Sequence, residues 1–305
     1  MAVDPQVQTI LDGLAVAAAE GPSLAEQTPD EVRASFAMMA MLGTPEDVAS
    51  VEDSTVAGPA GDLPIRIYRP ATEGTLPALV WYHGGGFVIG DLDSHDAVCR
   101  SLANRAGCVV IAVDYRLAPE HPFPAAPDDA IAAFDALRSR AGAFGIDPDR
   151  MATGGDSAGG NLAAVVANAR RGDVAFQLLI YPVTDMNRTS QSYRDNAEGY
   201  LLSAEMMTWF EGHYTGGAHL DDPRVSPLFE EDLSGVAPAF LLTAEFDPLR
   251  DEGEAYGKRL VDAGVPVEMR RYDGMVHGFF QMNAMVDAAD VALDEAGDAL
   301  RRGLA

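Results

Sequence analysis

The sequence has 305 residues, of which 47 are Asp or Glu and 21 are Lys or Arg, so its formal net charge at pH 7 is −26. Proteins bind nucleic acids and anionic bilayers mainly through Lys and Arg, so this balance argues against both as partners. With 48% hydrophobic and 22% charged residues, the composition is that of an ordinary globular protein, and the length fits one large domain or two small ones.

The cysteines and the N-terminus predict a cytoplasmic protein. Cys99 and Cys108 do not make a disulfide framework, and no Cys/His cluster has the spacing typical of zinc ligands. The first twenty residues lack a basic region, and Asp4 and Asp12 interrupt their apolar stretch, so a signal peptide is not expected. No apolar run reaches the roughly 20 residues that span a bilayer. We therefore expect no metal and no membrane partner.

Two helices are predicted near the N-terminus, over 3–19 and 26–41, where apolar residues recur at helical spacing. From about residue 62, short β-branched or aromatic runs alternate with amphipathic segments. The predicted strands are 64–70, 77–83, 108–115, 150–155, 176–182, 239–245 and 267–273, and the helices between or after them are 94–106, 126–140, 158–170, 252–263 and 284–301. This alternation predicts an α/β fold whose mostly parallel sheet is covered by helices on both faces.

One interval breaks the alternation. Nearly sixty residues separate the strands 176–182 and 239–245, and they contain one helical piece at 203–214. This is too long for a simple crossover, so we expect a segment above the carboxyl edge of the sheet, where such folds place ligands. No repeat or linker divides the chain, which predicts a single domain over 1–305.

The most informative segment is the sequence GDSAG at 155–159, between a predicted strand and an alanine-rich helix. This G-x-S-x-G pattern is typical of a nucleophile elbow, a sharp turn that exposes the hydroxyl of Ser157 and directs the N–H of Ala158 to the same spot. Glycines at both ends remove side chains that would collide in the turn. In an ordinary glycine-rich turn, Asp156 or Ser157 would only cap the helix. The position between strand and helix favours the nucleophile.

Three consecutive glycines, Gly84, Gly85 and Gly86, follow His83 at the end of the apolar run 77–82. Their uncovered backbone N–H groups are suited to an oxyanion hole at the end of a central strand. A flexible loop or a phosphate-binding turn is the alternative, but the latter would continue with Gly-Lys-Ser or Gly-Lys-Thr, and Phe-Val-Ile follows instead. Together, the two motifs predict an acyl-transfer site.

A serine nucleophile needs a base and an acid. Of the 6 histidines, three follow Ser157, and two of these, His213 and His219, lie in the long connection. His277 lies between the last strand and the last helix, where it could reach over the sheet edge, so it is the candidate base. Asp247 follows the strand 239–245 and is the candidate acid.

The sequence offers more than one candidate for the acid, because other carboxylates lie near the same strand end. Glu245 and Asp251 remain rivals of Asp247, whereas Asp273 is too close to His277 along a strand end.

These segments resemble the hormone-sensitive lipase-like esterases, a group of the α/β-hydrolase superfamily with an HGGG loop and a GDSAGG elbow. The resemblance covers roughly residues 60–300 in family order. It also takes in DLDSHD at 91–96, VDYRLAPEHPFPAA at 113–126, LLIYP at 178–182, NAEGYLL at 196–202, DPLRDEG at 247–253 and HGF at 277–279.

The resemblance implies an α/β-hydrolase fold with an eight-stranded sheet, one strand of it antiparallel, and a helical cap formed by about 1–45 and about 184–232. It implies hydrolysis of small-molecule carboxylic esters with short to medium acyl chains, without a cofactor. Carried over position by position, Ser157 is the nucleophile, His277 the base and Asp247 the acid. The N–H groups of Ala158 and of two among Gly84, Gly85 and Gly86 form the oxyanion hole.

Other residues that match the family are expected to have structural roles. His83 orients the glycine loop, Arg116 and Glu120 form a buried ion-pair scaffold, and His95 and His121 hold loops. Five residues of the long connection are expected to pack the cap, and any of them could line the acyl pocket: Tyr200, Leu201, Met206, Met207 and Trp209.

Three other functions compete with an esterase. An amidase or formamidase, or a lipase, could use the same triad, and a non-catalytic small-molecule receptor could share the fold. Receptors that resemble this family lose the catalytic histidine, whereas His277 is present here. The sequence leaves open whether the chain forms a homodimer.

Overall fold

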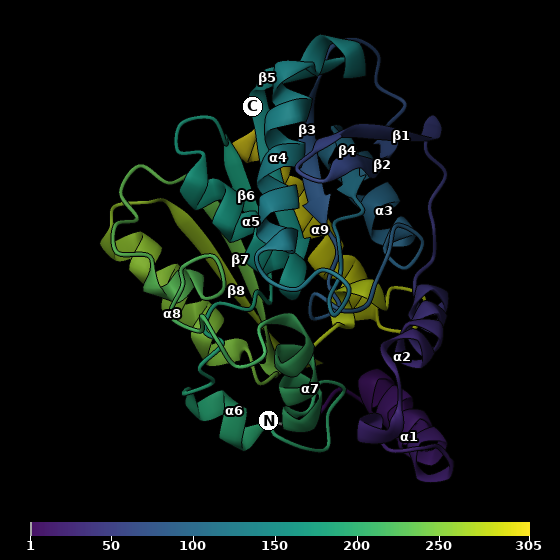
Figure 1. Cartoon of the computed structure of the whole chain (residues 1–305). Coiled ribbons are helices and arrows are strands. Elements are labelled where there is room, and N and C mark those ends of the chain that lie inside the picture. The colour runs from purple at the N-terminus through teal and green to yellow at the C-terminus, as the bar shows by residue number, and fades with distance from the viewer. Residues whose placement is uncertain (1) are drawn as a thin grey trace.

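The computed structural model describes residues 2–305 and is built around one eight-stranded sheet (Figure 1). The strand order is β1-β2-β4-β3-β5-β6-β7-β8. In chain order the strands are β1 (Ser50–Gly58), β2 (Gly61–Arg69), β3 (Leu76–Tyr82), β4 (Val109–Val113), β5 (Ile146–Asp156), β6 (Phe176–Ile180), β7 (Ala239–Phe246) and β8 (Val267–Val276). The strands from β3 to β8 pair in parallel, and β2 is antiparallel to both β1 and β4. This confirms the α/β-hydrolase fold expected from the sequence.

Sequence reasoning missed β1. The strand pairs with β2 along its whole length, from Ser50 opposite Arg69 to Gly58 opposite Gly61. Val56 is its only buried residue, because β1 lies at the sheet edge with most of its side chains in solvent. A strand with so few buried side chains lacks the apolar alternation by which strands are found in a sequence.

The helices are α1 (Pro5–Glu20), α2 (Pro29–Phe36), α3 (Asp96–Ala106), α4 (Ala125–Ser139), α5 (Ala158–Ala169), α6 (Gln191–Asp195), α7 (Ala204–Tyr214), α8 (Arg250–Asp262) and α9 (Asp287–Gly303). The predicted helix 26–41 is shorter in the structure. A capping box between Thr28 and Glu31 begins α2, and 3-10 turns at Leu24–Glu26 and Ala37–Leu42 flank it.

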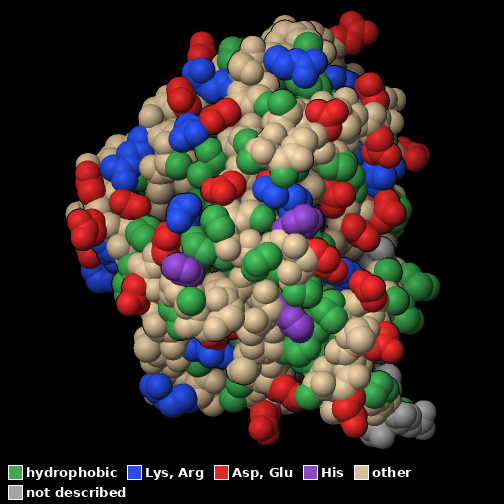
Figure 2. All heavy atoms as spheres, in the orientation of Figure 1, with side chains coloured by type: hydrophobic (Ala, Val, Ile, Leu, Met, Phe, Trp, Pro, Cys, Tyr) green, Lys and Arg blue, Asp and Glu red, His purple; other side chains and the backbone are tan. Residues whose placement is uncertain are grey.

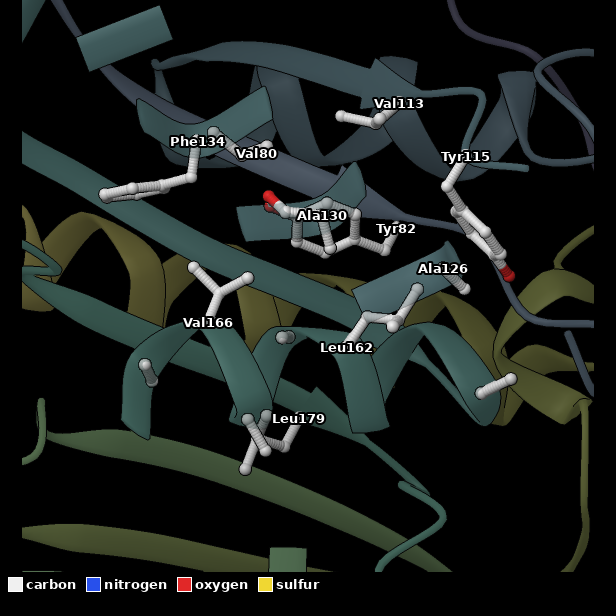
Figure 3. Packing of buried hydrophobic residues seen from close by; sticks show 14 of the residues in the cluster. Val80, Tyr82, Val113, Tyr115, Ala126, Ala130, Phe134, Leu162, Val166 and Leu179 are labelled. Atoms are coloured by element: carbon white, nitrogen blue, oxygen red, sulfur yellow. The ribbon is translucent and has the colours of Figure 1, made fainter. Parts of the chain in front are cut away.

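The core forms one layer on each face of the sheet. Alternate residues of β3 point to opposite faces, so Val80 and Tyr82 pack with α4, α5 and α8 while Leu79 and Trp81 pack with α1, α3 and α9. Figure 3 shows Val80 and Tyr82 on the first of these faces, near α5. The Tyr82 hydroxyl donates a hydrogen bond of 2.9 Å to the Ala130 carbonyl and so ties β3 to α4.

Four helices gather at one end of the sheet. The chain between β6 and β7 forms α6 and α7, and in Figure 1 these lie at the same end of the molecule as α1 and α2. Within residues 2–305, no helix is both long and apolar enough to cross a bilayer.

Arginine side chains on the surface pair with the surplus carboxylates. Figure 2 shows acidic side chains spread over the visible face with basic ones among them. Arg105 alone contacts Glu46, Asp290 and Asp294. Screening by salt weakens such exposed pairs, each worth about 0–1 kcal/mol, but it also relieves repulsion among the unpaired carboxylates.

We expect the melting temperature to rise by a few degrees as NaCl is increased to molar concentration. The physical reason is that the net charge of −26 leaves an excess of carboxylates, and salt screens their mutual repulsion. Differential scanning fluorimetry across an NaCl series measures this, and a flat or falling curve would reject adaptation of the acidic surface to salt.

Candidate active site

Ser157 lies in a strained turn between β5 and α5. Its φ of 56° and ψ of −117° are unusual for a residue with a side chain. The turn is held from both sides: the N–H of Ser157 donates to the Ile180 carbonyl at 2.9 Å, and its own carbonyl accepts from Val183 at 3.1 Å. A Cβ at Gly159 would collide with the backbone of Tyr82, so only glycine allows α5 to approach β3 this closely.

A continuous hydrogen-bond chain links Ser157, His277 and Asp247. The Ser157 Oγ lies 2.9 Å from His277 Nε2, and His277 Nδ1 lies 2.7 Å from Asp247 Oδ2. Asp247 is fully buried, and its other oxygen accepts the N–H of Leu249 at 2.8 Å. The three residues follow β5, β7 and β8, so the carboxyl edge of the sheet brings them together as the sequence predicted.

The two rival carboxylates are engaged elsewhere. Glu245 accepts the backbone N–H of Gly274 at 2.7 Å. Asp251 pairs with Arg250 and accepts the N–H of Ser192 at 2.8 Å. Burial raises the pKa of Asp251, but its bonds to Arg250 and Ser192 outweigh this and lower it. At Glu245 the bond from Gly274 lowers the pKa against a smaller effect of burial. The geometry therefore favours Asp247 as the partner of His277.

The three glycines after β3 differ in what they contact. The N–H of Gly84 donates to Asp156 Oδ1 at 3.0 Å, so this amide is already engaged. Gly85 and Gly86 instead line the cavity beside Ser157, and both have a positive φ, of 119° and 59°. A Cβ at Gly86 would collide with the ring of Phe210. Of the three glycines, Gly85 and Gly86 are thus the ones that line the cavity, whereas Gly84 does not.

His83 supports this loop, as predicted. Its Nδ1 lies 2.8 Å from the Gly84 carbonyl, and its ring stacks on Tyr115 with centroids 4.4 Å apart. Burial, together with the nearby His95, lowers the pKa of His83 to about 4, so the imidazole is neutral at pH 7. A neutral ring that donates to Gly84 has a structural role here.

A small, mostly apolar cavity of about 110 Å³ lies over Ser157 and His277. Of the five cap residues named from the sequence, Leu201 and Met206 line it. The others pack elsewhere: Tyr200 stacks on Phe246, Met207 is buried in the core, and Trp209 contacts Phe210 and His213.

Sequence reasoning missed four apolar residues of the cavity wall, Phe36, Ile89, Leu202 and Phe210. Phe210 lies one turn after Met206 on α7, and this i, i+4 spacing is a signal that could have pointed to it. Phe36 comes from the end of α2, far away in the sequence, and had no such signal.

The predicted buried pair of Arg116 and Glu120 is wrong. Arg116 binds the buried Asp129 through two hydrogen bonds of 2.7 and 2.8 Å. Glu120 is exposed and pairs with Arg33 of α2 at 2.7 Å, an interaction that lowers the pKa of Glu120 to about 2. A sequence cannot show that α2 lies against this loop, so the nearer arginine was the expected partner.

Of the two predicted loop-holding histidines, His95 is buried and His121 is exposed. His95 Nε2 lies 3.1 Å from Asp156 Oδ1 and 3.3 Å from the N of Gly84. The sequence suggests only a helix cap for Asp156, whereas in the structure its carboxylate contacts the glycine loop. Among the described residues, no group of three or more His, Cys, Asp or Glu side chains is arranged to hold a metal ion.

The fold and this constellation define an α/β-hydrolase, and comparisons with known proteins agree. The alpha/beta hydrolase fold family matches residues 79–281. The carboxylic ester hydrolase LipN of Mycobacterium tuberculosis is 42% identical, with 99% of this chain and 83% of that protein covered. The ethyl acetate hydrolase of Pseudomonas putida is also 42% identical, covering 90% of each chain.

Solved structures point to the same family. The hyperthermophilic esterase of the archaeon Pyrobaculum calidifontis has a TM-score of 0.94 at 38% identity, with 99% of each chain covered. This chain belongs to the hormone-sensitive lipase-like carboxylesterases of the α/β-hydrolase superfamily.

Proposed function

We propose that this protein is a serine carboxylesterase that hydrolyses small carboxylic esters through an acyl-enzyme. The observation that carries the proposal is the hydrogen-bond chain from Ser157 through His277 to Asp247, which opens into a small apolar cavity. Related proteins named as ester hydrolases support the reaction class.

In the first half of the reaction, Ser157 is the nucleophile. As its Oγ attacks the ester carbonyl, His277 Nε2 takes the hydroxyl proton and then gives it to the leaving alcohol. Asp247 accepts the hydrogen bond from His277 Nδ1, which keeps the correct tautomer and stabilises the imidazolium. A water molecule, activated by the same histidine, then attacks the acyl-enzyme and releases the acid.

The developing oxyanion is held by backbone amides. Gly85 and Gly86 border the cavity beside Ser157, and Ala158 begins α5, where the first N–H groups have no partner within the helix. Removing a single donor of this kind typically costs about 2.7–4 kcal/mol in transition-state stabilisation. Gly84 acts indirectly, because its own amide donates to Asp156.

We also propose that the chain is a single domain over 1–305 whose cap consists of about 1–45 and about 184–232. Phe36 of α2 and Met206 and Phe210 of α7 supply the apolar wall above Ser157, which supports this division. Arg33 ties α2 to two loops, since its guanidinium donates to the carbonyl of Val88, which follows the three glycines, and to the carbonyl of Ala118.

The apolar lining and small volume of the cavity favour short to medium acyl chains. Phe36 also lines a more open cleft of about 490 Å³, so its ring separates the two spaces. We expect Phe36→Ala to join them and to raise kcat/KM for p-nitrophenyl decanoate relative to butyrate by about tenfold, the effect of nearly two extra buried methylenes at ~0.8 kcal/mol each.

Val32→Ala is the matched control for Phe36→Ala, because Val32 is also partly buried on α2 but lines neither space. It should leave the ratio unchanged. An unchanged ratio in Phe36→Ala, or an equal shift in both variants, would show that Phe36 does not limit acyl length.

The proposed function is tested by measuring wild-type hydrolysis of p-nitrophenyl esters from acetate to dodecanoate, with the p-nitroanilide of butyric acid alongside. We expect the highest kcat/KM within the short to medium esters and much slower turnover of the anilide. No ester turnover would refute the carboxylesterase, whereas faster anilide turnover would identify an amidase.

A further inference from the structure

A buried polar cluster lies beneath the active-site cavity and has no part in the proton transfers described above. We call it the Asp156 cluster, and it consists of the side chains of Asp156, His95 and Gln281 with the backbone N–H of Gly84. Asp156 Oδ1 accepts from the Gly84 N–H at 3.0 Å, and Oδ2 accepts from Gln281 Nε2 at 3.0 Å. His95 Nε2 lies 3.1 Å from Asp156 Oδ1 and 3.1 Å from Gln281 Nε2.

The cluster joins the three segments on which the reaction depends. Gly84 directly precedes the two glycines of the oxyanion loop, and Asp156 directly precedes Ser157. Gln281 lies four residues after His277. The partners are distant in the sequence: Gly84 and Asp156 are 72 residues apart, and Asp156 and Gln281 are 125 apart. One carboxylate therefore contacts the amide loop, the nucleophile turn and the base loop together.

The surroundings of Asp156 suit an ionised carboxylate. Asp156 is only 2% exposed, and an ionised carboxylate offers acceptors on both oxygens, as the donors from Gly84 and Gln281 require. Burial by itself raises the pKa of Asp156, but the nearby histidines outweigh this and lower it, so the group stays charged. The Asp156 carboxylate lies so close to Gly84 that a Cβ at position 84 would collide with it.

We propose that Asp156 is a positioning residue for the oxyanion hole. Its carboxylate holds Gly84 through the backbone N–H, and thereby sets the amides of Gly85 and Gly86 at the correct distance from Ser157 Oγ. Donors of an oxyanion hole act only if they lie 2.7–3.1 Å from the place where the charge develops, and a misplacement of about 1 Å costs about 10²-fold in rate. The role rests on the proposed esterase function.

A purely structural role for Asp156 makes a different prediction. Loss of a buried hydrogen bond would lower the melting temperature and leave the folded enzyme as fast as before. A positioning role instead lowers kcat while KM changes little, because the oxyanion interaction is made in the transition state and hardly at all with bound substrate.

The first test is Asp156→Asn, which keeps the shape but places an NH₂ group against one of the two donors. We expect kcat for p-nitrophenyl butyrate to fall about 10²-fold, with KM within about threefold of wild type. Asp185→Asn is the matched control: Asp185 is also a buried aspartate, 3% exposed, but its carboxylate accepts from Asn187 and Thr189, outside the cluster. It should retain the wild-type kcat.

The double variant Asp156→Asn with Gln281→Glu exchanges amide and carboxylate across one hydrogen bond. The introduced asparagine amide would be the donor and the introduced glutamate carboxylate the acceptor, so the link between the two loops is restored. We expect kcat to recover about tenfold relative to Asp156→Asn alone. A wild-type kcat in folded Asp156→Asn, or a double variant no faster than the single one, would overturn the proposal.

A second readout needs no substrate. Hydrogen exchange measured by mass spectrometry should be faster over residues 84–90 in Asp156→Asn than in wild type, and unchanged in Asp185→Asn. Unchanged exchange there in the folded variant overturns the positioning role whatever the rates are. Because this readout is independent of hydrolysis, it separates failure of the positioning role from failure of the esterase function, which wild-type turnover reports.

If Asp156→Asn does not fold, Gln281→Met removes one donor and should give about a tenfold loss of kcat with the same change in exchange.

Discussion

Ser157→Ala is expected to lower kcat for p-nitrophenyl butyrate by about 10⁶-fold, to the level of residual catalysis by the oxyanion hole and substrate binding. The alanine removes the Oγ that lies 2.9 Å from His277 Nε2, so no acyl-enzyme can form. The cavity and the proposed oxyanion amides remain, so substrate affinity should change little. Steady-state kinetics, with circular dichroism to confirm folding, measure the effect.

A serine elsewhere in the core serves as the control. Ser101 is fully buried in α3, where its Oγ donates to Glu46 at 2.9 Å, and it lines no part of the cavity. Ser101→Ala should therefore keep the wild-type kcat even if the protein is less stable. Turnover by Ser157→Ala near the wild-type rate would refute the assignment of the nucleophile.

Asp247→Asn is expected to lower kcat by about 10⁴-fold. The carboxylate lies 2.7 Å from His277 Nδ1, and an asparagine there can present its NH₂ group to that nitrogen, which stabilises the wrong tautomer of the imidazole. The base would then carry its proton on Nε2 and could not accept one from Ser157. The same kinetic assay measures this loss.

The rival carboxylates provide the controls for Asp247→Asn. Glu245→Gln and Asp251→Asn alter groups that bind Gly274 and Arg250, so both variants should stay within a few-fold of the wild-type kcat. A larger loss of kcat in either variant than in Asp247→Asn would identify that residue, in place of Asp247, as the acid. The variant Ser157→Ala with Asp247→Asn should be no slower than Ser157→Ala alone, because the triad acts as one unit.

Most of the fold could be predicted from local patterns, and the exceptions have physical causes. The central strands are buried on both faces, and continuous apolar runs such as 109–113 indicate them directly. Strand β1 was missed because its pairing with β2 involves backbone atoms, while its side chains are mostly exposed. The extent of α2 depended on its capping box, which the apolar spacing alone did not reveal.

The sequence predicted only part of the candidate site. Ser157, His277 and Asp247 could be named because each follows a recognisable strand, and the ends of parallel strands meet at one edge. Which glycine amides are free could not be named, since the answer depends on Asp156, which lies 72 residues from Gly84. The wrong pairing of Arg116 with Glu120 has the same origin, because both true partners are brought by other elements.

By itself, the sequence determined the fold class and the family resemblance, and it named Ser157, His277 and, among three candidate acids, Asp247. These follow from short patterns, in which the identity and spacing of neighbouring residues decide whether a segment is a strand, a turn or a helix. Only the tertiary structure decided which glycines and which side chains line the cavity, and that Asp156 joins three loops. Such contacts form between residues far apart in the chain, and their geometry depends on how the cap and the loops pack over the sheet.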